Sequence, residues 1–128
     1  MMSEKSDRIV FVDLDGTLLL ANSFHMLLEA IVTVRPAGWA PALLRFFARR
    51  AAPGAGARTA AKAQIIGYLD GLGSDESDEL RCRLLEQMQC VISEPVLQIV
   101  REEQERGATV VLATAAPSWY AAPASERL

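Results

Sequence analysis

The sequence predicts an α/β fold in which a parallel sheet carries an inserted module of helices. Two short segments with continuous apolar centres, RIVFVD at 8–13 and ATVVLAT at 108–114, have the composition of fully buried strands. The long segment between them is patterned as helices, and the second run directly follows a helix that ends at Gly107. A strand followed by a helix, a glycine and a further strand is typical of a parallel sheet.

Most predicted helices have a recognisable start or end. Asn22 or Ser23 can cap the first helix, Pro41 suits the first turn of the second, and Gly71 ends the third. Ser74 caps a fourth helix with one apolar face, formed by Leu80, Leu84, Met88 and Val91. The predicted helices cover 24–34, 41–51, 59–70, 74–92 and 95–106, and a last one begins near Pro123.

Length and composition predict one globular domain. The chain has 128 residues, and 51% of them are hydrophobic, which is enough to form a core. The formal net charge is −3 and no basic tract is present, so we expect no nucleic-acid partner.

The cysteines and the N-terminus bear on location. Cys82 and Cys90 lie in one helical pattern, about two turns apart, which is too far for a disulfide. We expect reduced, buried or half-buried thiols, which fit a cytoplasmic protein. The N-terminal MMSEKSDR is unlike a signal peptide. No membrane segment is expected, because the longest uncharged stretch, 107–125, contains two prolines.

Polar side chains follow both predicted strands. Asp13 and Asp15 come directly after the first strand, and Thr114 ends the second. Ligands of open parallel sheets bind at the carboxyl ends of the strands. Two carboxylates and a hydroxyl there suit phosphoryl transfer, with one carboxylate as nucleophile and the other as general acid and base. Gly16 allows a tight turn, and Thr17 can hold it by a local hydrogen bond.

The alternative interpretation of this segment is a surface turn without a catalytic role, because aspartate and glycine are common in turns. The position of D-x-D-G-T directly after a buried strand favours the catalytic interpretation. Mg²⁺ prefers carboxylate and carbonyl oxygens, needs few protein ligands beside a phosphate, and would screen an anionic nucleophile from an anionic substrate.

The segment DLDGTL at 13–18 resembles the first motif of the haloacid dehalogenase-like hydrolase superfamily. The segment VVLATAAP at 110–117 is similar to its second motif, and the helical segment between them resembles the cap of the phosphoserine-phosphatase-like subclass. The resemblance implies a partial Rossmann-like core, formed by 1–20 and 93–128, with a helical cap over 21–92.

The resemblance also implies a role for each motif residue. Asp13 would be the nucleophile and a Mg²⁺ ligand, and Asp15 the general acid and base with its backbone carbonyl on Mg²⁺. Thr114 and the backbone N–H of Ala115 would hold the phosphate. Because position 15 is aspartate, the pattern points to a phosphatase or phosphotransferase, with a small phosphorylated metabolite as substrate.

The family also uses a lysine and an acidic pair that lie downstream of the second motif, and neither follows Thr114. The two lysines, Lys5 and Lys62, are not placed to substitute. We therefore expect an impaired site and a two-stranded sheet with an open apolar strand at 9–12. A truncated gene product, the front part of a longer protein, or a sheet completed by a partner or second copy would each explain this.

The function expected is a Mg²⁺-dependent phosphohydrolase working through an aspartyl-phosphate. The alternatives are a non-catalytic remnant or binding module, and the N-terminal phosphatase-like part of a longer protein such as a membrane polyprenyl prenyltransferase fusion. His25 is expected to be structural or on the surface. Of the cap cations, Lys62 is the candidate for substrate contact, while the arginines are expected to form a solvated helix face. Aromatic residues expected in the cap core or in a partner-facing patch are Trp39, Phe46 and Phe47.

Overall fold

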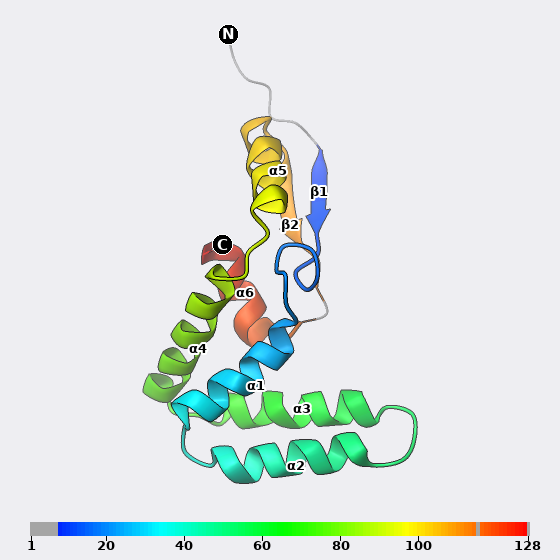
Figure 1. Ribbon diagram of the computed structural model, residues 1–128, viewed down its shortest axis with the longest axis vertical. Coiled ribbons are helices and arrows are strands. Elements are labelled where there is room, and N and C mark those ends of the chain that lie inside the picture. Colours follow the sequence, from blue (N-terminus) through cyan, green and yellow to red (C-terminus); the bar gives the residue numbers. More distant parts are fainter. Residues whose placement is uncertain (1–7, 115, 128) are drawn as a thin grey trace. The chain divides into compact units, whose positions relative to one another are not determined.

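A computed structural model of the chain describes residues 8–114 and 116–127. These residues form an α/β fold with a parallel sheet, as the sequence predicts (Figure 1). The elements in chain order are β1 (Ile9–Val12), α1 (Ser23–Val34), α2 (Trp39–Ala51), α3 (Ala57–Asp70), α4 (Ser74–Gln89), α5 (Glu94–Glu105), β2 (Thr109–Leu112) and α6 (Ser118–Arg127).

The sheet joins two strands that lie far apart in the sequence. β1 and β2 pair in parallel, with Ile9 opposite Thr109 and Val12 opposite Leu112. The pairing continues past the strand ends, because the N–H of Ala113 donates to the carbonyl of Val12 at 2.8 Å. Both strands therefore end at the same edge of the sheet, which is where parallel sheets place their ligands.

Only one face of this sheet is covered by the residues described. Val12 is buried and α5 contacts β2, whereas Ile9 is 56% and Phe11 66% exposed. The prediction of two fully buried strands is therefore wrong for this chain. A strand has two faces, and within residues 8–114 and 116–127 no element covers the face of Phe11. Within the part of the chain described, β1 pairs with β2 alone, so its other edge is unpaired, and the open apolar edge that the sequence predicts at 9–12 is present.

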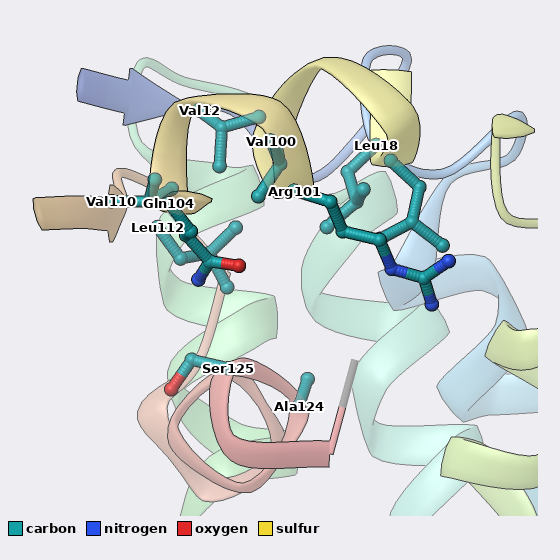
Figure 2. A pocket seen from close by; sticks show the side chains of 10 residues that line it. Val12, Leu18, Val100, Arg101, Gln104, Val110, Leu112, Ala124 and Ser125 are labelled. Carbon is teal, nitrogen blue, oxygen red and sulfur yellow. The ribbon is translucent and has the colours of Figure 1, made fainter. Parts of the chain in front are cut away.

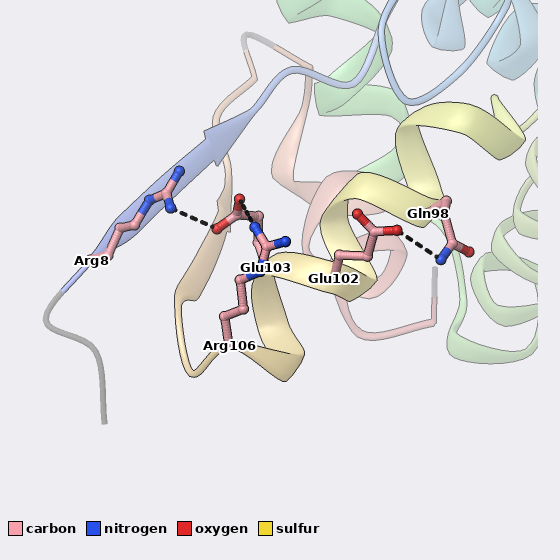
Figure 3. A network of polar contacts seen from close by, with 5 residues as sticks. All are labelled: Arg8, Gln98, Glu102, Glu103 and Arg106. Carbon is pink, nitrogen blue, oxygen red and sulfur yellow. Dashed lines mark hydrogen bonds and ion pairs between the residues drawn. The ribbon is translucent and has the colours of Figure 1, made fainter. Parts of the chain in front are cut away.

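An ionic and polar network links the start of β1 to α5 (Figure 3). Glu103 forms ion pairs with Arg8 at 3.1 Å and with Arg106 at 3.6 Å. On the same helix, the Gln98 amide donates to Glu102 at 3.2 Å. The Glu103 side chain is only 13% exposed, so the Arg8 pair is screened less than a fully exposed one and helps to fix β1 beside α5.

The end of α4 differs from the prediction. The helix was expected to reach residue 92 but ends at Gln89. The backbone beyond it pairs instead with the loop after β1: the N–H of Leu20 donates to Val91, and the N–H of Ser93 to Leu18, both at 2.8 Å. These long-range backbone bonds replace the last helical turn.

The cysteine prediction is half correct. Cys82 and Cys90 are free thiols, as expected, but both are exposed rather than buried. Burial was expected from the general preference of free cysteine for protein interiors, which neither residue follows here.

The last helix begins earlier than predicted. α6 starts at Ser118, five residues before Pro123, which lies inside the helix. Proline interrupts helical hydrogen bonding, but it does not end this helix. Burial of one face, formed by Tyr120, Ala121 and Ala124, outweighs that cost.

The chain divides into two compact units. The first, here called the sheet unit, contains Met1–Met26 and Glu86–Leu128, and the second, the helical unit, contains Leu27–Leu85. In the helical unit α2 and α3 run side by side (Figure 1). Tyr68 at the end of α3 donates its hydroxyl to the carbonyl of Ala37, just before α2, at 2.8 Å. In the part of the chain described, no helix has both the length and the apolar character needed to span a membrane.

Candidate active site

In the loop after β1 the leucines are buried and the carboxylates are more exposed. Leu14, Leu18 and Leu19 are buried, whereas Asp13 is exposed. Hydrogen bonds close the loop on itself: the N–H of Leu14 donates to Asp13 Oδ1 at 2.9 Å, and the N–H of Leu19 to the Leu14 carbonyl at 2.8 Å. Gly16 has a φ of 75°, a left-handed conformation that favours glycine. The leucines thus anchor a turn that presents Asp13 to solvent.

Asp15 is held by the first residue of α1. Its Oδ1 accepts a hydrogen bond from the backbone N–H of Ser23 at 2.8 Å. The N-terminus of a helix carries a partial positive charge, which is complementary to a carboxylate. Asn22 caps the same helix through a hydrogen bond from the His25 N–H to its Oδ1, at 3.0 Å. Of the two caps predicted, Asn22 is therefore the one used, which leaves the Ser23 side chain for another contact.

That contact is with Tyr120 of α6. Ser23 Oγ and Tyr120 Oη share a hydrogen bond of 2.7 Å, and both side chains are completely buried. Burial, together with the negative charge of Asp15, raises the pKa of Tyr120 to about 12, although the hydrogen bond with Ser23 acts in the opposite direction. The phenol therefore stays neutral at physiological pH and supports the Ser23 end of the site without adding a charge.

Thr114 follows β2 at the same edge of the sheet as Asp13. The Thr114 hydroxyl oxygen accepts a hydrogen bond from the N–H of Ala116 at 3.0 Å. A hydroxyl has one hydrogen of its own, so the Thr114 O–H can still donate to an anion. Ala115, the second predicted phosphate ligand, lies outside the described residues.

An open depression lies beside Thr114. Its lining is formed by residues of β2, of the following loop and of α6: Val110, Val111, Leu112, Thr114, Ala116, Ser118, Ala121, Ala122 and Ser125. Among residues 8–114 and 116–127 no charged side chain lines it, and the first turn of α6 begins there at Ser118. The partial positive charge at the start of a helix favours anions. Neither aspartate lines this depression. The structure thus joins Asp15 to α1 and, through Ser23, to α6, and places Thr114, whose hydroxyl can donate to an anion, beside this depression.

A second pocket, of about 110 Å³, lies between the sheet, α5 and α6 (Figure 2). Val12, Leu112 and Val100 give it an aliphatic wall, and the charged side chain of Arg101 contributes to it. Pockets that bury a metabolite or drug-sized ligand typically measure about 300–1,000 Å³. This pocket is therefore too small to be the substrate site.

The acidic loop has suitable donors for a hard cation. Among the residues described, no group of three or more His, Cys, Asp and Glu side chains could hold a metal ion. Mg²⁺ needs fewer protein ligands than that, because it keeps several waters and binds phosphate oxygens. The exposed carboxylate of Asp13 and the loop carbonyls beside it are the donor types that Mg²⁺ uses.

Sequence reasoning missed two neighbours of Asp15. Ser23 was considered only as a helix cap, and Tyr120 was not connected with the site. The two residues are 97 positions apart, so no local pattern could connect them. His25 is exposed, as predicted for a surface histidine. Lys62 is an exposed residue of α3 in the helical unit.

These features define an α/β protein with an acidic site at the carboxyl edge of its parallel sheet. The family model described as haloacid dehalogenase-like hydrolase matches residues 10–128. The chain therefore belongs to the haloacid dehalogenase-like hydrolases, as the motif resemblance predicts. Comparison with curated proteins and with solved structures gave no match.

Proposed function

We propose that the sheet unit is a Mg²⁺-dependent phosphomonoesterase that works through an aspartyl-phosphate on Asp13. One observation carries the proposal: Asp13 is exposed directly after β1, while Asp15, two residues on, is fixed by the Ser23 N–H at 2.8 Å. A free carboxylate beside a positioned one suits a nucleophile paired with a general acid.

In the first step, a carboxylate oxygen of Asp13 attacks the phosphorus of a phosphomonoester. The bond from phosphorus to the leaving oxygen breaks, and protonated Asp15 gives its proton to that oxygen. The alcohol departs and an aspartyl-phosphate remains. Asp15 is half-buried rather than buried, so its carboxyl group can reach a substrate.

In the second step, the Asp15 carboxylate takes a proton from water, and the water oxygen attacks the phosphorus. The bond between phosphorus and Asp13 breaks and inorganic phosphate leaves. Asp13 is again a carboxylate and Asp15 is again protonated, so the cycle closes. The chain from Ser23 to Tyr120 keeps Asp15 in one orientation through both steps.

Thr114 and Mg²⁺ would bind the phosphate. The Thr114 hydroxyl hydrogen would donate to a phosphate oxygen, since its own oxygen already accepts from Ala116. The N–H of Ala115 would be the second donor, as the family resemblance implies. The Asp13 carboxylate and the Asp15 carbonyl would hold Mg²⁺. When bound, this ion offsets the repulsion between the anionic nucleophile and the anionic substrate.

We further propose that the helical unit is a cap that selects the substrate, as in the phosphoserine-phosphatase-like subclass. Its boundaries, Leu27–Leu85, fall within the segment 21–92 that the resemblance implies. A small phosphorylated metabolite fits this assignment. The free, exposed thiols of Cys82 and Cys90 support a reducing compartment such as the cytoplasm.

Phosphate release from para-nitrophenyl phosphate tests the proposal. The 128-residue chain with Mg²⁺ is expected to turn the substrate over slowly, because no lysine follows Thr114, and Asp13→Asn is expected to reduce turnover below detection. Asp70→Asn, an exposed aspartate at the end of α3, is the matched control and should behave as wild type. If Asp13→Asn retains wild-type turnover, the proposed nucleophile is wrong.

A binding module without catalysis is the second candidate. It is favoured by the depression beside Thr114, where no lysine or arginine among the residues described offsets the phosphate charge. Thermal unfolding with Mg²⁺ and beryllofluoride, a phosphoryl mimic on aspartate, separates the two. A higher midpoint in wild type but not in Asp13→Asn, without turnover, indicates a binding module. No response and no turnover would contradict both.

A further inference from the structure

The helical unit contains a long stretch with only one sign of charge. Between Glu29 and Asp70 there are six basic residues and no acidic one, although the whole chain has a net charge of −3. All six are exposed: Arg35, Arg45, Arg49, Arg50, Arg58 and Lys62. Half of them belong to α2, which has no acidic residue. The three exposed arginines of α2 are electrostatically complementary to an anionic partner.

The same helix exposes large apolar side chains. Leu44 is 71% and Phe47 55% exposed, and they are one turn apart on α2. Phe47 and exposed Val32 of α1 both line a shallow depression, together with Leu28, Leu43, Thr33 and one acidic residue, Glu29.

Phe47 is also held in place. Its ring lies edge-on to the ring of Phe46, with the ring centroids 5.1 Å apart, and Phe46 is buried. The exposed ring of Phe47 therefore packs on the core of the helical unit. Because the ring is already ordered, moving it into an apolar phase costs little side-chain entropy.

The combination of exposed apolar and basic side chains on α2 distinguishes between classes of partner. A soluble polyanion would use the arginines but gain nothing from Leu44 and Phe47. An apolar protein groove would cover Leu44 and Phe47 but would not need arginines beside them. Exposed leucine and phenylalanine flanked by arginine are typical of helices that lie in the headgroup region of anionic bilayers.

We propose that α2 is the docking surface of this chain for an anionic lipid bilayer. Leu44 and Phe47 enter the boundary between headgroups and acyl chains, and Arg45, Arg49 and Arg50 pair with lipid phosphates. The interaction is at the membrane surface and does not depend on the proposed phosphatase activity, so either assignment can fail without the other.

Co-sedimentation of the full chain with vesicles tests this docking. We expect binding to vesicles of phosphatidylglycerol mixed with phosphatidylcholine, and at least tenfold weaker binding to pure phosphatidylcholine. The double variant L44S/F47S should lose on the order of tenfold or more in affinity, because two apolar side chains no longer enter the bilayer. The triple variant R45Q/R49Q/R50Q should lose about as much, and less as salt is raised.

Matched controls come from elsewhere in the chain. L20S/I99S removes apolar side chains of the sheet unit with 71% and 57% exposure, close to those of Leu44 and Phe47. R83Q/R101Q/R127Q removes three exposed arginines outside α2. Both controls should bind anionic vesicles as wild type does, and circular dichroism should show that every variant is folded.

Three results would overturn the proposal. The first is a wild-type chain that does not bind anionic vesicles. The second is a loss of binding in the control variants equal to that in the α2 variants. The third is binding of single-stranded polyuridylate in place of vesicles, unchanged in L44S/F47S, which would assign the basic surface to a nucleic acid.

Discussion

The two units of this chain bury their apolar side chains in different ways. In the helical unit α2 and α3 lie side by side, and Phe46 and Ile65, one from each helix, are buried. In the sheet unit β1 pairs with β2 on one edge, yet Phe11 remains mostly exposed. A helix can bury its apolar stripe against one neighbour, whereas a strand has two faces and two edges. A helix pair therefore reaches a closed core with fewer partners than a sheet does.

The units also differ in charge. The sheet unit contains five basic and ten acidic residues, for a net charge of −5, and the helical unit eight basic and six acidic, for +2. The acidic unit includes the proposed nucleophile and the buried pair of Ser23 and Tyr120. The basic unit includes the exposed face of α2. The proposed phosphatase site and the proposed membrane-docking helix thus belong to separate units, so each proposal can be tested by variants of its own unit.

The largest effect is expected in the helical core. Phe46 is 1% exposed, so Phe46→Ala should lower the free energy of unfolding by about 3–5 kcal/mol, through lost burial and a cavity. Its neighbour Phe47 is exposed, and Phe47→Ala should cost less than about 1 kcal/mol. Urea unfolding of both variants measures the difference. Equal losses would mean that α2 does not pack as described.

Each unit contains one tryptophan, Trp39 in the helical unit and Trp119 in the sheet unit. Fluorescence of Trp39→Phe and Trp119→Phe backgrounds therefore reports on the units one at a time. If Phe46→Ala shifts only the Trp39 transition, the units unfold independently. If it shifts both equally, they unfold as one cooperative body.

A smaller, pH-dependent effect is expected in the sheet unit. Because folding raises the pKa of Tyr120 from 10.0 to about 12, the folded protein keeps a proton that the unfolded chain loses. This stabilisation is complete below pH 10 and is lost as pH rises towards 12, by on the order of 2–3 kcal/mol. The Tyr120→Phe variant should therefore lose less free energy of unfolding between pH 10 and pH 12 than wild type does.

The matched measurement is the tyrosinate absorbance of a Tyr68→Phe background, in which Tyr120 is the one remaining tyrosine. Its titration should have a midpoint near pH 12, or be displaced by alkaline unfolding. A midpoint near 10 in the folded protein would show that Tyr120 is not buried against Ser23.

The smallest effect on stability is expected at the open face of the sheet. Phe11→Thr should change the free energy of unfolding by no more than about 0.5 kcal/mol, because Phe11 is exposed. It should, however, reduce self-association measured by light scattering, since an open apolar strand promotes pairing between chains. Val12→Thr, at a buried position of the same strand, should destabilise the fold instead. If Phe11→Thr destabilises as much, that face is covered in solution.

The parallel sheet and the acidic loop could be predicted from the sequence because their signals are local. An apolar run followed by D-L-D-G-T identifies a strand end, and it needs no knowledge of the rest of the chain. The position of Thr114 after β2 follows in the same way. Burial of the strands could not be predicted, because it depends on which elements cover each face.

Long-range contacts account for the remaining errors. The end of α4 is set by backbone bonds from Leu20 and Ser93, and the early start of α6 by burial of Tyr120. The support of Asp15 by Ser23 and Tyr120 is of the same kind, since it joins segments that no periodicity relates.

The register of the sheet has a consequence for synthesis. Ile9 pairs with Thr109, so a ribosome must add about a hundred residues after β1 before its partner exists. At typical translation rates this takes roughly 5–20 s. During that interval the helical unit can already fold, because its contacts are closer in sequence. The apolar strand β1 has no strand to pair with until β2 is made. Nascent β1 is therefore an apolar segment that stays unpaired for most of the synthesis of this chain.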